Sequence, residues 1–80
     1  MLNEFGTTPP NDTRECANML VHFRFCSENV IFGEYDLRRS LRRIGVKDVE
    51  IMLTDLIISG ILTPHDRSGG SQWYRFNQYP

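Results

Sequence analysis

Residues 34–60, EYDLRRSLRRIGVKDVEIMLTDLIISG, decide the fold because they hold two helix signals with only a few residues between them. Leu37, Leu41 and Ile44 recur at the spacing of one helical face, which predicts a helix over residues 34–44 that stops at Gly45. Asp48 is a helix-capping residue type and an apolar stripe follows it, so a second helix is expected until Gly60. So short a connection favours a helix-turn-helix.

An extended pattern follows the second helix. Residues 61–68 and 71–76 are separated by Gly69 and Gly70, and glycine accepts the positive φ that hairpin turns need. The apolar run at residues 30–32 can pair with this hairpin, because a two-stranded hairpin needs a third strand for independent stability. The sequence therefore predicts a three-stranded sheet.

The N-terminal third supplies the remaining wall of the core. Asp12 and Glu15 match a capping box, so a first helix is expected from there to about residue 27. Residues 1–11 lack periodicity and are predicted to be a flexible tail before one domain of residues 12–80. The order is helix, strand, helix, helix, strand, wing, strand. We interpret it as an α+β fold of the winged helix-turn-helix kind.

Composition narrows the class of protein. Eighty residues suffice for one domain, and no apolar run approaches the roughly 18 residues of a membrane span. No secretory signal is visible, so we predict a cytoplasmic protein. Cys16 and Cys26, ten residues apart on the expected first helix, are too far apart to bridge and are interpreted as buried small hydrophobes. With His22 and His65 they lack zinc spacing, so no metal is expected.

Catalysis has little support in the sequence. No His, Cys or Ser lies in a recognisable nucleophile motif, and the acidic residues are scattered over helix caps and exposed positions. We therefore expect a protein that is not an enzyme, with no cofactor and no small-molecule substrate.

Charge is unevenly distributed, although the formal net charge is only −1. Residues 34–47 carry five basic and two acidic side chains, a local balance of +3. Residues 48–66 carry four acidic side chains and no Lys or Arg. The first helix of the helix-turn-helix is thus basic and the second is acidic.

The basic helix is a candidate nucleic-acid interface. Arg38, Arg39, Arg42 and Arg43 spread over the face opposite the apolar stripe, where guanidinium groups can contact phosphates without reading sequence. The other candidate contacts are Lys47, Arg67, Ser68 and Arg75. The alternative is a solvated surface with local pairing, such as Glu34 with Arg38.

The acidic helix is a candidate protein-interaction surface. Ile51 and Ile58 lie seven residues apart on the side away from its apolar stripe, with Glu50, Thr54 and Asp55. These acids would repel phosphate, so an apolar and acidic surface suits a protein partner better. The alternative is that neighbouring elements, such as Leu2 and Phe5 of the tail, cover the isoleucines.

Three aromatic residues near the C-terminus could stack on bases. Trp73, Tyr74 and Phe76 occupy an extended segment in which successive side chains alternate faces. Such alternation favours a core role for Tyr74 and Phe76.

Residues 30–77, about 48 of the 80, resemble the small winged-helix domain at the C-terminus of primase-helicase and related replication proteins of phages and mobile elements. The matching residues are Phe32, Asp36, Leu37, Arg39, Val49, Leu53, Leu56, Gly60, Ile61, Leu62, Gly69, Gly70, Tyr74, Arg75, Phe76 and Asn77. The resemblance implies a module that helps a replication enzyme engage DNA or a partner, with the catalytic domains elsewhere.

Two functions follow as hypotheses. The first is a non-enzymatic module that binds DNA through the phosphate backbone, without sequence specificity, as part of or accessory to a replication protein. The second is a module for protein interaction, either as a homodimer or with a replication-protein partner, through the acidic and apolar face.

Overall fold

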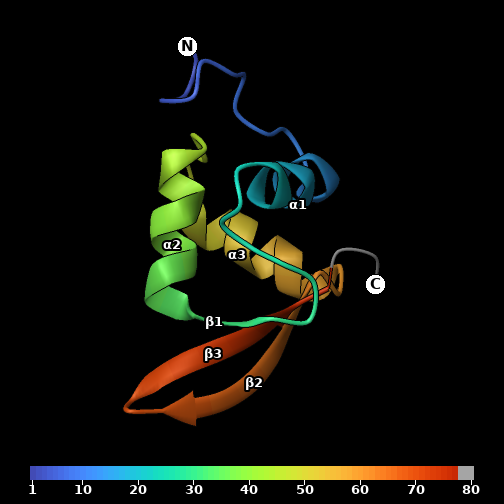
Figure 1. Cartoon of the computed structure of the whole chain (residues 1–80), viewed down its shortest axis with the longest axis vertical. Helices are drawn as coiled ribbons and strands as arrows, with labels where there is room; N and C mark the ends of the chain where they lie inside the picture. The colour runs from blue at the N-terminus through green and yellow to red at the C-terminus, as the bar shows by residue number, and fades with distance from the viewer. Residues whose placement is uncertain (78–80) are drawn as a thin grey trace.

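Three helices lie on one side of a three-stranded antiparallel sheet in the computed structural model, which describes residues 1–77 and, for Ser68, the backbone only (Figure 1). The elements in chain order are α1 (Thr13–His22), β1 (Ile31–Gly33), α2 (Glu34–Arg43), α3 (Val49–Ile58), β2 (Leu62–Ser68) and β3 (Ser71–Phe76). This confirms the predicted α+β class, and the arrangement is compatible with the expected winged helix. No helix within residues 1–77 combines the length and apolarity needed to cross a membrane.

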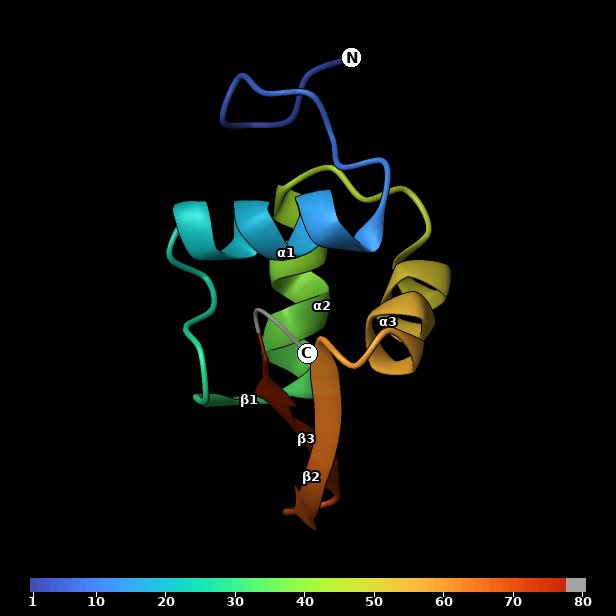
Figure 2. The same ribbon diagram turned by 90° about the vertical axis from the view of Figure 1, so that its right-hand side faces the viewer.

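β3 is the central strand, and the sheet order is β1-β3-β2. Both neighbours run antiparallel to β3, and Figure 2 shows the β2–β3 hairpin extending away from the helices. Gly69 and Gly70 have φ of 61° and 81°, as a two-residue hairpin turn with positive φ at both central positions requires. The predicted hairpin and its third strand are confirmed.

The two central helices begin and end close to their predicted limits. The Asp48 carboxylate accepts a hydrogen bond from the Ile51 amide at 3.1 Å, which caps α3 as its residue type predicts. At the end of α2, Gly45 takes a φ of 94°, a value that L side chains rarely adopt. Local chemistry therefore sets both ends of the short α2–α3 connection.

α1 is shorter than predicted, because it ends at His22 and not near residue 27. Arg24 takes a φ of 63°, and the amides of Phe25 and Cys26 both donate to the Leu20 carbonyl, at 2.8 and 3.1 Å. This turn satisfies the end of the helix without a glycine, so the usual stop signal is missing from the sequence.

The early end of α1 changes the placement of the cysteines. The prediction that Cys26 lies on the same helix as Cys16 is wrong. Cys26 follows the turn after α1 and returns to the core beside Cys16. Both thiols are free and buried, which confirms that they act as small core side chains. Burial raises the pKa of each thiol to about 12, so the thiolate form is strongly disfavoured.

The core is built around the apolar face of α2. Leu37, Leu41 and Ile44 are at most 1% exposed, as their spacing predicts. The other large side chains that are fully buried are Leu20, Leu56, Leu62 and Phe76. α1, α3 and the sheet each contribute to this cluster, so α2 is held on three sides.

The N-terminal segment packs against the end of α2, although residues 1–11 form no helix or strand. The Asn3 side-chain amide donates to the Ile44 carbonyl at 3.0 Å, and its oxygen accepts from the Phe5 and Thr7 amides. Phe5 stacks on Phe23 with ring centroids 4.3 Å apart. The flexibility expected of this segment stays a prediction.

Comparing Gly45→Ala with Gly69→Ala tests this packing. Both glycines have positive φ, so either alanine should cost about 1 kcal/mol or more of unfolding free energy. An added Cβ at Gly45 would also lie 2.9 Å from Pro9 Cγ, whereas a Cβ at Gly69 meets nothing within 4 Å. We expect a larger loss for Gly45→Ala in urea unfolding. Equal losses would mean that Pro9 moves aside for the added methyl group at no cost.

Candidate nucleic-acid interface

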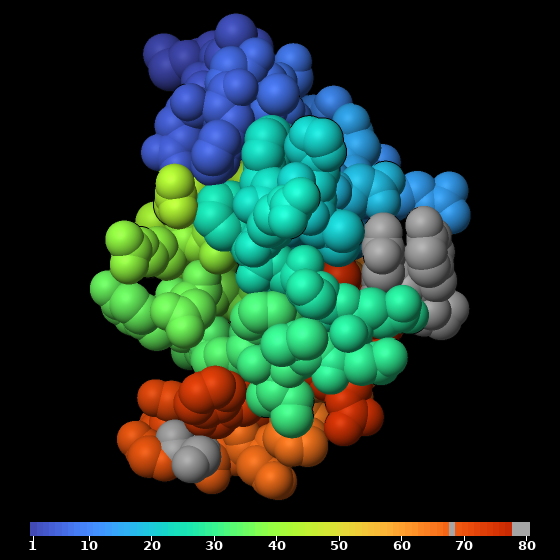
Figure 3. All heavy atoms as spheres, in the orientation of Figure 1, coloured from blue at the N-terminus to red at the C-terminus, as the bar shows by residue number. Residues whose placement is uncertain are grey.

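The outer face of α2 carries the arginines. Because Leu37, Leu41 and the C-cap residue Ile44 are buried, the opposite face of this ten-residue helix is turned toward solvent. Figure 1 shows α2 at one margin of the molecule with its outer side uncovered, and its atoms form that margin in Figure 3. Arg39, Arg42 and Arg43 are exposed and Arg38 is half-buried.

Arg38 is bound by two carboxylates. Its guanidinium pairs with Glu34 one turn earlier, at 3.5 Å, and with Glu50 on α3. The hydrogen bond from Arg38 holds the pKa of the Glu50 carboxyl below its ordinary value, and the nearby charges of Arg38 and Arg42 act in the same direction. Glu34 also accepts a hydrogen bond from the Tyr74 hydroxyl at 3.2 Å. A polar chain therefore links β3, α2 and α3.

Arg43 is engaged by the N-terminal segment. Its guanidinium pairs with the Glu4 carboxylate and lies 5.5 and 4.9 Å from the ring centroids of Phe5 and Phe25. Ion pairing and two cation–π contacts thus hold the same group. Acids from α3 and from the N-terminal segment therefore reach Arg38 and Arg43, so basic and acidic groups do not lie on separate surfaces at these two positions.

Arg39 and Arg42 remain available on α2. Neither pairs with a carboxylate of residues 1–77, although Arg42 is close enough to Glu50 to help lower the pKa of its carboxyl. Lys47, in the connection after α2, is also exposed. We call Arg39 and Arg42 the free arginine pair. These two groups can bind an anion without first breaking an ion pair within the described chain.

The hairpin carries the other predicted contacts. Arg67 lies at the base of the turn and donates to the Gly70 carbonyl at 3.5 Å. The charges of Arg67 and Arg38 both act to lower the pKa of the Tyr74 hydroxyl, which burial raises overall. Arg75 is exposed on β3, in register with Ile31 and Thr63. The Ser68 side chain lies outside the described part of the chain.

The aromatic residues divide between core and surface. Tyr74 and Phe76 are buried, as their alternation predicts, and burial is the main cause that raises the pKa of the Tyr74 hydroxyl. The Trp73 ring lies over Gly33, where an added Cβ would be 3.7 Å from it. Tyr35 on α2 is 72% exposed and was missed by the sequence analysis. Tyr35 precedes Arg38, Arg39 and Arg42 by three, four and seven residues, and this helical spacing could have placed it on their face.

The outer face of α3 exposes the predicted isoleucines. Ile51 is 60% and Ile58 77% exposed, and a shallow hollow of about 220 Å³ lies along Glu50, Ile51, Thr54 and Asp55. Phe5 does not cover them, because it packs on α1 and the turn after it. The predicted interaction residues therefore share one exposed surface, on which Glu50 is also the partner of Arg38.

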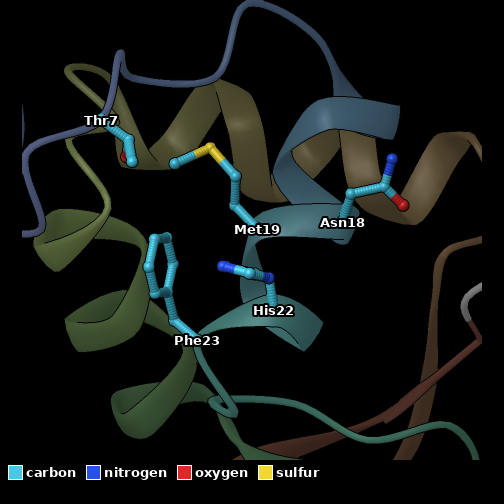
Figure 4. Close-up of a pocket in the computed structure, with 5 residues that line it drawn as sticks. All are labelled: Thr7, Asn18, Met19, His22 and Phe23. Carbon is cyan, nitrogen blue, oxygen red and sulfur yellow. The ribbon is translucent and has the colours of Figure 1, made fainter.

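An apolar pocket of about 360 Å³ lies between α1 and the N-terminal segment (Figure 4). Phe23 and the Met19 thioether point toward Thr7, whereas the Asn18 amide points away. His22 is the single titratable lining residue. Such a lining suits an apolar side chain better than a charged polymer.

Within residues 1–77, no three His, Cys, Asp or Glu side chains are grouped so that they could hold a metal ion. Comparisons with known protein families, with curated proteins and with solved structures found no match to this chain.

Replacing Arg38 by glutamine should raise the pKa of the Glu50 carboxyl toward its ordinary value. A carboxyl whose pKa is depressed by folding contributes stability above its unfolded pKa of about 4.3, and this is lost as pH falls through the folded value. The stability gap between wild type and Arg38→Gln should therefore shrink on acidification.

NMR titration of the Glu50 carboxyl carbon measures the pKa directly. Arg39→Gln is the matched control, because it removes the same charge one residue along α2 from a group that does not pair with Glu50. If both variants gave the same shift, a general charge effect would replace the specific ion pair as the cause.

Proposed function

We propose that this chain is a winged helix-turn-helix module that binds nucleic acid through the phosphate backbone. The observation that carries the proposal is the free arginine pair on the outer face of α2. The helix order and the sheet order β1-β3-β2 support the winged-helix interpretation, in which the β2–β3 hairpin is the wing.

The ion pairs of Arg38 and Arg43 favour a smaller set of proposed contacts than the four arginines of α2. Arg39 and Arg42 bind phosphates, with Lys47 beside them and Arg67 and Arg75 on the wing. Arg38 and Arg43 contribute less, because a phosphate must compete with the carboxylates that already hold them. Contacts of this kind fix a protein on the backbone and read no sequence.

α3 argues against recognition in the major groove. Its exposed face carries Glu50 and Asp55, which repel phosphates on both sides of a groove. Its remaining exposed side chains include Ile51 and Ile58, and these offer no hydrogen bonds to base edges. Binding therefore occurs through α2 and the wing. A role in or beside a replication protein rests on the resemblance of residues 30–77 to such modules.

Charge reversal on α2 tests the proposal. Arg39→Glu combined with Arg42→Glu should abolish binding to a labelled duplex at low salt, measured by fluorescence anisotropy. In wild type, the logarithm of the affinity should fall linearly with the logarithm of salt concentration, and single neutral substitutions at these sites should each reduce that slope by roughly one.

Arg14→Glu combined with Arg24→Glu is the matched control, because it changes net charge equally at exposed positions outside α2. This control should keep most of the affinity. An equal loss of affinity in both double variants would mean that net charge alone accounts for binding. Unaltered binding in the α2 variant would refute the proposal.

A second function is favoured by the exposed face of α3. Ile51 lines a hollow with Glu50, Thr54 and Asp55, and Ile58 is exposed two helical turns further along, which gives apolar side chains with an acidic margin. Isolated exposed apolar residues are ordinary, but two on one helix face beside a hollow suit a protein partner or a second copy.

Sedimentation tests this second function. If the protein forms a concentration-dependent dimer through α3, Ile51→Asp should make it monomeric. The substitution should not harm folding, because an acidic side chain is favourable in the first turn of a helix. Val30→Asp is the matched control, since Val30 is also an exposed apolar residue and lies in the segment before β1, outside α3. A wild-type monomer at high concentration would rule out the homodimer.

A further inference from the structure

Tyr35 presents its ring to solvent beside the free arginine pair. It lies in the first turn of α2, is 72% exposed, and its hydroxyl makes no hydrogen bond within residues 1–77. Burying this ring against a partner would remove a large apolar area from water. Neither the core nor the polar chain through Tyr74 uses it.

Helical spacing places the ring and the two charges on one face. Arg39 follows Tyr35 by four residues, and Arg42 follows by seven, so the three side chains succeed one another along the exposed side of α2. Arg38 borders the same face, but Glu34 and Glu50 occupy its guanidinium. The result is one aromatic surface followed along the helix by two available cations.

This combination distinguishes single strands from duplexes. In a duplex both faces of each base are covered by its neighbours, so an exposed tyrosine would gain little from the phosphate backbone. In a single strand an unstacked base can lie on the ring while adjacent phosphates reach the guanidinium groups, which is how many proteins hold single strands without sequence preference.

We propose that Tyr35, Arg39 and Arg42 form a binding site for single-stranded DNA, in which one unpaired base stacks on the Tyr35 ring and the successive phosphates on one side of that base contact the two arginines. The site rests on the proposed function, because it uses the same arginines. It adds a preference for unpaired strands that backbone contacts alone do not give.

The test compares Tyr35→Ala with Tyr35→Phe on the full chain. Affinities for labelled oligo-dT, for oligo-rU and for a duplex of equal length are measured by anisotropy at low salt. Tyr35→Ala should weaken oligo-dT binding by roughly five- to a hundred-fold, the range for loss of one stacked base. It should leave duplex binding unchanged, and Tyr35→Phe should behave as wild type. Circular dichroism of both variants checks the fold.

The other outcomes overturn the stacking site, the assignment to DNA or the proposed function. Duplex binding that needs Arg39 and Arg42, with oligo-dT binding unaffected by Tyr35→Ala, would remove the stacking site and leave the proposed function in place. Equal losses on duplex and single strand would also remove it, since the ring would then act without regard to unpaired bases. Tighter binding of oligo-rU than oligo-dT would overturn the assignment to DNA. No binding to any of the three would refute the proposed function together with the site.

Discussion

The burial of one stripe of α2 constrains the rest of the molecule. Leu37, Leu41 and Ile44 are packed among α1, α3 and the sheet, and each contributes about 1.5–3 kcal/mol by leaving water. With that stripe inside, the arginines on the remaining positions of the ten-residue helix must face outward. The exposed basic surface is therefore a geometrical consequence of the core, and a change that rotated α2 would disturb both together.

The availability of each arginine is decided by acids from other parts of the chain. Glu50 on α3 takes Arg38, and Glu4 in the N-terminal segment takes Arg43. Both pairs lie near the surface, so their contribution to stability is small, yet they hold two of the four guanidinium groups in fixed positions. Two of the four arginines on α2 are thus held in ion pairs and two are not, although the sequence pattern does not distinguish them.

Local chemistry made most of the fold predictable, whereas the site depended on contacts between distant residues. The α3 cap at Asp48 and the turn at Gly69 and Gly70 have residue types that act on their own neighbours, so sequence alone predicted them correctly. The end of α1 was missed because Arg24 adopts positive φ without being glycine. The pairing of Arg38 with Glu50 joins two helices, and helical periodicity cannot report which groups meet across such a junction.

Salt acts on two different interactions of α2, and their separation matters for any binding study. Under the proposed function, raising ionic strength should weaken phosphate binding by Arg39 and Arg42, and it also screens the ion pair between Arg38 and Glu50 that joins α2 to α3. At Arg38 the two effects of salt on phosphate affinity oppose each other. Salt weakens the attraction of Arg38 for a phosphate, but it also weakens the competing attraction of Arg38 for Glu50. Arg39 has no such competitor in residues 1–77. The salt response at Arg39 should therefore report the proposed nucleic-acid contact alone, whereas that at Arg38 should combine such a contact with release from its carboxylates.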